Sequence, residues 1–337
     1  MRSGRLLALF LFLLNFIPLQ AEENPAQQLH SLFDRDWEYQ MRHDPIGASE
    51  LGDRRWNDQW PDVSLSSLRE QFQNSRQELQ DLHAIDRSKL NPEDQLNYDV
   101  FEYNTKDYVE SEQYKWYLVR TNTFSGIQTV EGLVDSLRFE TVKDYDDWLG
   151  RLHNFPAYMD QNISLMREGI KQHVVIAKVI GEKVLTQFNA MDWQDPTKHG
   201  FYKPFKEFPS SFSDIDKQRL TIAAKDRIAA DVLPAFHRFL DFMEKEYIPA
   251  SLEQAGIWQV PNSASTYAYL ARSMTTTTLT PEQVHEIGLN EVKRIRAEME
   301  KVKDQAGFKG TLAEFLNYLR TDPKFYFKDS DELLRHA

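Results

Sequence analysis

Residues 267–299 read YAYLARSMTTTTLTPEQVHEIGLNEVKRIRAEM, and the second half of this stretch is the best specified helix of the chain. Thr280 stands before Pro281 and three residues before Gln283, which is the pattern of a capping box with proline in the first turn. Apolar residues at helical spacing then share one face, namely Val284, Ile287, Val292, Ile295, Met299 and Val302. The stretch predicts an amphipathic helix with Glu291 within the apolar face and His285 at its edge.

The His285-Glu286 pair on this helix resembles the start of a zinc-peptidase motif but does not complete it. Such a motif needs a second histidine four residues after the first, so that both imidazoles lie on one face, and position 289 is Leu289. None of the nine histidines has another histidine four residues later, and the chain has no cysteine. We therefore predict no catalytic residue and no metal ligand here, although a site assembled from distant positions stays open.

Helical periodicity extends over most of the remaining sequence, so we predict an all-α fold with long loops and at most a few short strands. Tyr114 to Val130 and Trp193 to Ser211 are the irregular segments, and Pro156 is expected to break or kink one helix. The predicted helices are one ending before Asp44-Pro45, one over Leu65–Leu79, one starting at Asn91, one over Tyr145–Ile170, one over Asp214–Tyr247 bent at Pro234, and two over Thr311–Arg320 and Ser330–Ala337.

The first 21 residues have the features of a secretory signal. Arg2 and Arg5 precede an apolar run from Leu6 to Ile17, and Ala21 is the small residue at the expected cut. The run is shorter than the roughly 20 residues of a membrane span, although an uncleaved anchor is the alternative. We predict an exported, periplasmic or secreted protein with no stable membrane insertion after cleavage.

The net charge of the chain is −12, which argues against a nucleic-acid partner because such binding depends on basic residues. Other motifs of known chemistry are missing, including the GxSxG serine elbow and the glycine-rich phosphate loops. Asp144, Asp146 and Asp147 are interpreted as an acidic helix N-terminus and not as a calcium loop. His237 is interpreted as a partly buried structural histidine.

Several blocks, in order, resemble a bacterial family known as domain of unknown function 885. The most specific are the threonine-rich run and helix of Tyr267 to Met299; the others are Gly52-Asp53-Arg54 with Trp60 to Ser64, Arg167-Glu168-Gly169-Ile170, Leu233-Pro234-Ala235, and Glu246-Tyr247-Ile248-Pro249-Ala250. Two positions depart from the family pattern, because Ser263 and the Gln172-His173 pair stand where glycine is expected. The resemblance covers nearly the whole chain after the signal.

The resemblance implies an all-helical, zinc-metallopeptidase-like body with a deep cleft between two halves. Family members carry their zinc signature downstream of the blocks found here, so zinc is expected in the full-length protein and not in this chain. The last predicted helix starts at Ser330 and stops without a cap, so we expect a chain cut within its fold. A frayed natural end is the alternative.

We therefore expect residues 22–337 to be the N-terminal scaffold and cleft wall of an exported metallopeptidase-like protein, inactive alone. Tyr267, Tyr269 and Arg272, in a stretch expected to be irregular, and Glu291 are the candidate substrate-binding residues for a peptide. Core packing of both tyrosines, and a surface ion pair of Glu291 with Arg294, are the alternatives. A non-catalytic helical module that binds peptides or cell-wall fragments is the second hypothesis. The sequence does not give the oligomeric state.

Overall fold

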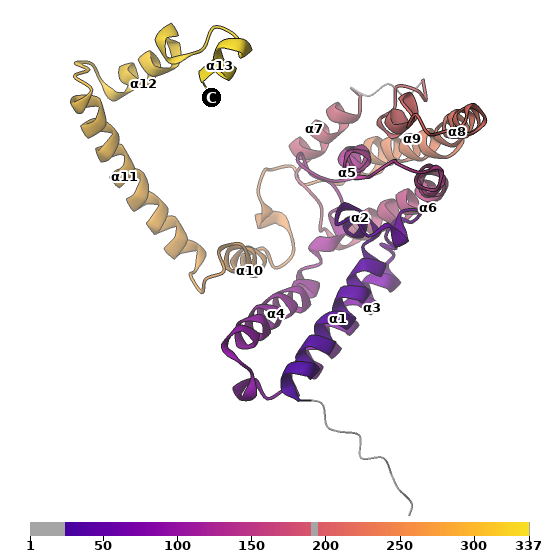
Figure 1. The fold of residues 1–337 in the computed structure, drawn as a ribbon. Helices are drawn as coiled ribbons and strands as arrows, with labels where there is room; N and C mark the ends of the chain where they lie inside the picture. The colour runs from indigo at the N-terminus through magenta and orange to yellow at the C-terminus, as the bar shows by residue number, and fades with distance from the viewer. Residues whose placement is uncertain (1–23, 190–194, 337) are drawn as a thin grey trace, which may run out of the picture. The chain divides into compact units, whose positions relative to one another are not determined.

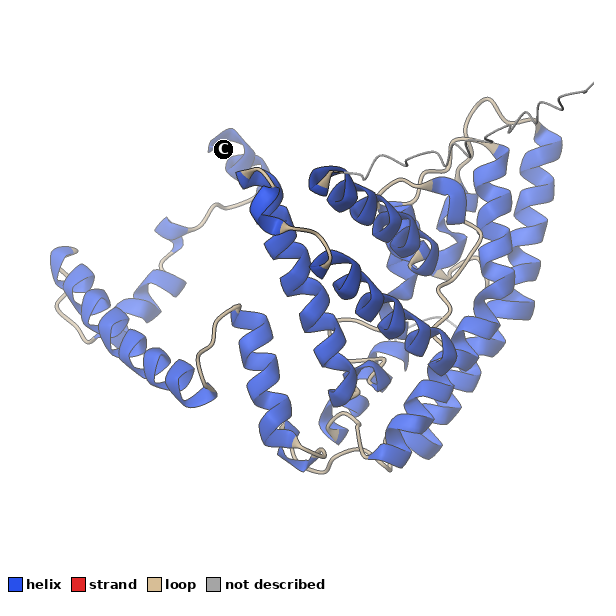
Figure 2. Cartoon of the chain, turned by 90° about the horizontal axis from the view of Figure 1, so that it is seen from below, coloured by secondary structure: helices blue, strands red, loops and turns tan. Residues whose placement is uncertain are grey.

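The computed structural model describes residues 24–189 and 195–336 of the chain. The predicted signal, residues 1–21, lies outside the described residues, as does the beginning of the predicted connector at Trp193. Two compact units are present, Met1–Pro261 and Asn262–Ala337. Within the described residues, regular structure is entirely helical apart from two isolated bridges, which confirms the all-α prediction (Figure 2). Among those residues, no helix combines the length and apolar character needed to cross a membrane.

The first unit contains nine α-helices in its described part (Figure 1). They are α1 (Pro25–His43), α2 (Pro45–Glu50), α3 (Leu65–His83), α4 (Pro92–Ser111), α5 (Leu133–Ser136), α6 (Val142–Gln172), α7 (Lys178–Asn189), α8 (Asp214–Arg227) and α9 (Leu233–Phe242). Short 3-10 helices connect them, namely η1 (Arg54–Trp56), η2 (Arg87–Lys89), η3 (Glu112–Tyr114), η4 (Trp116–Leu118), η5 (Ile127–Gly132), η6 (Gly200–Lys206) and η9 (Ile257–Gln259).

The helix starts predicted from local signals are confirmed in the first unit. Asn91 caps α4 by accepting a hydrogen bond from the Asp94 amide at 2.9 Å, and α1 ends at His43, directly before Asp44-Pro45. Helices α1, α3 and α4 lie side by side (Figure 1). They share a small apolar cluster made of Leu29, Leu32, Leu82, Ile85, Leu90 and Tyr98.

Helix α6 is the centre of the larger core, and it runs unbroken through Pro156. The predicted break is therefore wrong, and the alternative of a kink at this proline stays a prediction. An interior proline costs a helix about 3 kcal/mol, but Phe155 and Met159 on either side of it are fully buried. Burying each such side chain contributes about 1.5–3 kcal/mol, so packing keeps the helix continuous.

The predicted long helix over Asp214–Tyr247 is one helical run that contains two π-helical turns, η7 (Ile228–Val232) and η8 (Met243–Tyr247). The first π turn lies immediately before Pro234, whose ring and missing N–H disturb regular α-helical hydrogen bonding. Inserting a wider turn there lets the chain continue as a helix into α9. His237 on α9 is exposed, so its interpretation as a partly buried histidine is wrong.

The segment from Tyr114 to Val130 contains no α-helix, as the sequence indicated. It consists of 3-10 turns and a tight loop closed by a bridge between Thr121 and Gly126. Gly126 has a φ of 134°, and a Cβ atom at this position would lie 2.7 Å from the Thr121 Cα and 2.8 Å from the Arg120 carbonyl oxygen. Only glycine allows this close approach.

The second unit contains α10 (Ser263–Thr275), α11 (Pro281–Gln305), α12 (Leu312–Thr321), η10 (Pro323–Phe325) and α13 (Ser330–His336). The prediction of an irregular stretch around Tyr267 to Arg272 is wrong, because these residues lie within α10. Asn262 before this helix and Thr276 after it both adopt left-handed backbone angles, with φ of 55° and 53°. A residue with left-handed backbone angles therefore stands at each end of this regular helix.

Helix α11 begins as predicted but does not bury its apolar face. The Gln283 amide donates to the Thr280 hydroxyl at 3.2 Å, and the Gln283 side chain accepts from the Thr280 amide at 2.8 Å, which completes the capping box. No residue of α11 is buried, and Ile287, Val292, Ile295 and Val302 are exposed. The predicted apolar face is therefore present but largely uncovered, because α10 and α12 cover too little of the helix.

Candidate functional site

Two of the residues predicted to bind a peptide lie together on α10, and the third lies apart. Tyr269 is 6% exposed, and the Arg272 guanidinium lies 5.7 Å from the centre of its ring. Tyr267 is 56% exposed. Since residues two positions apart point to different sides of a helix, the three side chains do not form one surface. Tyr269 fits the packing alternative, and a peptide contact by any of them stays a prediction.

Glu291, the fourth candidate, forms the surface ion pair that was its alternative interpretation. Its carboxylate accepts hydrogen bonds from Arg294 at 2.6 and 2.9 Å, and Arg294 also contacts Glu298 at 2.9 Å. The hydrogen bond from Arg294 lowers the pKa of Glu291. The carboxylate is thus engaged along the surface of its own helix.

The zinc ion implied by the resemblance does not fit the part of the chain that the structure describes. Over these residues, no group of three or more histidine and acidic side chains lies close enough together to hold a metal ion. His285 and Glu286 are both exposed on α11. No catalytic step is therefore derived through zinc from the residues present.

A groove in the first unit is the strongest candidate for a binding site, and the sequence did not reveal it. It consists of two neighbouring cavities of about 450 and 290 Å³ that share Ile46, Arg120 and Tyr158. Together they fall in the size range of small-ligand sites. The lining of the larger cavity combines aliphatic and charged side chains with aromatic, amide and hydroxyl groups, the last three from Tyr39, Gln40, Gln71, Ser75, Tyr108 and Tyr158. We refer to these two cavities as the Arg120 groove.

Arg120 is the arginine of the groove, and the buried side-chain amide of Asn162 binds its guanidinium. The Asn162 side chain is fully buried on α6; it accepts a hydrogen bond from Arg120 Nε at 2.8 Å and donates to the Tyr158 carbonyl at 2.8 Å. Arg120 also interacts with the Tyr158 phenol: burial raises the pKa of Tyr158, and the charge and hydrogen bond of Arg120 oppose this rise. No carboxylate among the described residues lies within 4.0 Å of the Arg120 nitrogens. The tight Gly126 loop fixes the Arg120 backbone.

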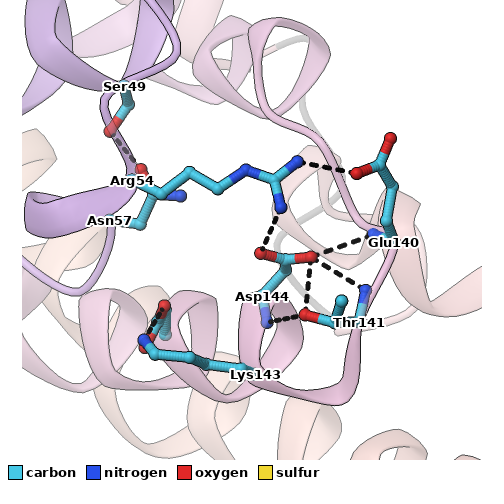
Figure 3. Close-up of polar contacts among 8 residues, drawn as sticks. Ser49, Arg54, Asn57, Glu140, Thr141, Lys143 and Asp144 are labelled. Atoms are coloured by element: carbon cyan, nitrogen blue, oxygen red, sulfur yellow. Dashed lines mark hydrogen bonds and ion pairs between the residues drawn. The ribbon is translucent and has the colours of Figure 1, made fainter.

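The Gly52-Asp53-Arg54 block fixes the chain between α1 and α3, which forms one wall of the groove. Arg54 donates to Glu140 at 2.8 Å and to Asp144 at 3.3 Å (Figure 3). Asp144 also accepts the Thr141 amide at 2.8 Å, within the capping box that begins α6. This geometry matches the interpretation of Asp144 as part of an acidic helix N-terminus. The contacts of Arg54 with Glu140 and Asp144 join the wall of the groove to α6.

Arg151 of α6 attaches the same wall from inside the core. Its Nη2 donates to the carbonyls of Pro45 and Trp56 and to the Ser49 hydroxyl, at 3.2, 2.8 and 2.9 Å. The side chain is completely buried, and burial lowers its pKa to about 10. The Trp60 indole donates to the Arg151 carbonyl at 2.6 Å and stacks on Tyr158. The wall and the floor of the groove are thus parts of one packed structure.

Two further blocks of the resemblance meet on the other side of α6. Arg167 donates to Glu246 at 2.8 and 2.6 Å, and Tyr247 accepts a hydrogen bond from the Ile176 amide at 3.4 Å. His173, of the Gln172-His173 pair found where glycine was expected, ends α6 with a φ of 58°. Glycine adopts this conformation most easily, so the backbone here is of the kind that favours the expected residue.

An acidic pair lies between α1 and α3 near the inner end of the groove. Glu78 is buried, accepts a hydrogen bond from Asn74 at 2.6 Å, and lies beside Asp36. Burial, together with the charge of Asp36, raises the pKa of Glu78 to about 7. Burial also raises the pKa of Tyr39 to about 12, so its phenol remains protonated at neutral pH.

The groove could not be predicted from the sequence, because its residues come from segments that are distant in the chain. Arg120 lies in an irregular segment with no motif, and Asn162 is one polar residue on a long helix. Only the Gly52-Asp53-Arg54 block pointed to this region, and it did so through the resemblance.

Comparison with a known structure supports the fold. The chain is 18% identical in sequence to "the putative lipoprotein from Colwellia psychrerythraea", whose crystal structure it matches with a TM-score of 0.83. The match covers 93% of this chain and 57% of that chain, so this chain spans little more than half of its structural relative. No curated protein matches the sequence.

The family comparison covers most of the chain. The family model described as "Bacterial protein of unknown function (DUF885)" matches residues 45–337. The matched range includes each of the blocks from Gly52 to Met299, and it spans both compact units. The chain therefore belongs to the bacterial DUF885 family of proteins of unknown function.

Proposed function

We propose that this chain is the scaffold and substrate-cleft wall of an exported metallopeptidase-like protein, and that the Arg120 groove binds the peptide. The observation that carries the proposal is the groove itself, in which aromatic and amide side chains surround a cation with no acidic partner among the described residues. Such a lining suits the apolar side chains, the amides and the charged end of a peptide. The signal-like residues 1–21 support export.

The proposal assigns bond cleavage to the longer protein. There, a zinc ion would act as a Lewis acid on the peptide carbonyl and would activate water. The residues of this chain would hold the peptide and exclude water around it. The 57% coverage of the structural relative supports this division.

The test compares this chain with the product of the same reading frame continued past Ala337. We expect the longer protein to contain about one zinc per chain and to hydrolyse peptides until a chelator is added. The present chain should bind peptides without cleaving them. A longer product without zinc, insensitive to chelator and unable to hydrolyse peptides would contradict the peptidase part.

A non-catalytic peptide-binding module is the second candidate, and the groove also favours it, since all of its lining lies in the first unit. Peptide binding by a longer product that lacks metal would support this candidate. Cell-wall fragments are the alternative ligand, and titration with soluble muropeptides would distinguish them from plain peptides.

A further inference from the structure

We infer that Arg120 is the anchor for the carboxylate at the C-terminal end of a bound peptide. This inference rests on the proposed function, since it names the chemical group of the peptide that the groove recognises. The guanidinium belongs to both cavities, so a ligand in either one lies beside it.

Arg120 differs from three other arginines that lie on or near α6, and it differs from the completely buried Arg151 in lining a groove. Arg54, Arg167 and Arg238 each contact a carboxylate, at 2.8, 2.6 and 3.1 Å respectively. Arg120 is half-buried and has no such partner among the described residues. A guanidinium that is partly removed from water gains from a carboxylate on its free edge, because two parallel hydrogen bonds can form.

The orientation of Arg120 suits this role. Asn162 accepts the Nε hydrogen and is itself fixed by the Tyr158 carbonyl, so the guanidinium is oriented before a ligand arrives. Prior orientation lowers the entropic cost of binding. Asn162 and the Tyr158 phenol together use only part of the five N–H donors of the guanidinium, so the remaining N–H groups can donate to a ligand.

The acidic side chains of the groove are engaged elsewhere or lie away from Arg120. Asp44 accepts the Gly47 amide at 3.1 Å, and Asp62 accepts the Ser64 amide at 2.9 Å, so both serve as turn and helix caps. Glu50 also lines the smaller cavity and forms no ion pair of 4.0 Å or less with Arg120. His43 stacks on Tyr39 and contacts its carbonyl through Nδ1 at 2.9 Å. Arg120 is therefore the charged group of the groove that is available to an anion.

The groove also explains why a peptide terminus fits better than a small free acid. Tyr39, Tyr108 and Tyr158 provide aromatic surface, and Gln40 and Gln71 provide amides that pair with a peptide backbone. A single carboxylate would use only the Arg120 corner. A peptide with a free C-terminus would use that corner and the rest of the lining together.

The experiment is calorimetric titration of the whole chain with three probes, which are an N-acetylated tripeptide with a free C-terminus, its C-terminal amide, and N-acetylalanine. We expect the free acid to bind at least about tenfold more tightly than the amide, the effect of about one charge-assisted hydrogen-bond pair. Arg120→Gln should remove this preference. Arg138→Gln, which removes one exposed charge outside the groove, should retain it.

Equal binding of the acid and the amide to the unaltered protein would overturn the anchor and leave peptide binding intact. Binding of N-acetylalanine as tight as that of the tripeptide would support the carboxylate site but contradict the peptide function. A preference retained in Arg120→Gln would also overturn the inference. Arg120→Lys, which keeps the charge without the planar fork, should retain a reduced preference, and its melting curve shows whether the fold is intact.

Discussion

Helices α6 and α11 have similar lengths and amphipathic patterns, but their surroundings differ completely. Helix α6 buries fourteen of its 31 residues against α8, α9 and the loops of the first unit, whereas α11 buries none of its 25. The pattern of apolar residues determines which face of a helix is apolar. Whether that face is covered depends on how many neighbouring elements pack against it, and the second unit offers α11 only α10 and α12.

The largest expected contrast comes from removing one apolar side chain from each unit. Phe236 of α9 is fully buried beside Phe155 of α6. Phe236→Ala should therefore lower the free energy of unfolding by about 3–5 kcal/mol. Val292→Ala on α11, at a position that is 67% exposed, should change it by about 0.5 kcal/mol or less. Urea denaturation followed by circular dichroism checks both, and similar losses in the two variants would contradict the contrast.

The second contrast concerns two arginines with opposite environments. Arg151→Ala should destabilise the first unit by about 2–4 kcal/mol, because a large buried side chain is lost and the carbonyls of Pro45 and Trp56 each lose one donor. Arg294→Ala removes an ion pair on the surface of α11 and should leave the unfolding curve unchanged. Thermal melting of both variants is the measurement. A small effect of Arg151→Ala would show that the wall of the groove is held by other contacts.

How much of this molecule follows from its sequence depends on how local each feature is. Capping boxes were predicted at Thr280 and a cap at Asn91, because each involves residues three positions apart. Helix α10 was missed, since its limits are set by the left-handed residues Asn262 and Thr276. The Arg120 groove was missed because Arg120 and Asn162 are 42 positions apart. Contacts of that kind exist only after the chain has folded.

The acidic pair of Glu78 and Asp36 should make the stability of the first unit depend on pH. The pKa of Glu78 rises from an ordinary value of 4.5 to about 7 on folding, so the folded chain retains a proton that the unfolded chain loses. The free energy of unfolding should therefore fall by about 1–2 kcal/mol as the pH rises from 4.5 to about 7.

Glu78→Gln should remove this part of the pH dependence, whereas Glu291→Gln on α11 should leave it unchanged. Urea midpoints measured at several pH values give the slopes. A pH slope in Glu78→Gln equal to that of the unaltered chain would contradict the assignment.

The smallest contrast compares the capping boxes of α6 and α12. Asp144→Ala removes the acceptor of the Thr141 amide and the contact with Arg54, and should cost about 1 kcal/mol. Glu314 accepts the Thr311 amide at 2.7 Å but is exposed, so Glu314→Ala should have the weaker effect. The melting temperatures of the two variants check this order. A larger loss of stability in Glu314→Ala than in Asp144→Ala would contradict it.

The most direct test of the account is hydrogen exchange of the whole chain with and without the free-acid tripeptide. The account predicts slower exchange on binding in residues 39–46 and 119–127, which line the Arg120 groove, and no change in α10 or α11. Protection confined to residues 263–305, around Tyr267 and Arg272, would place the peptide on the second unit and contradict the account.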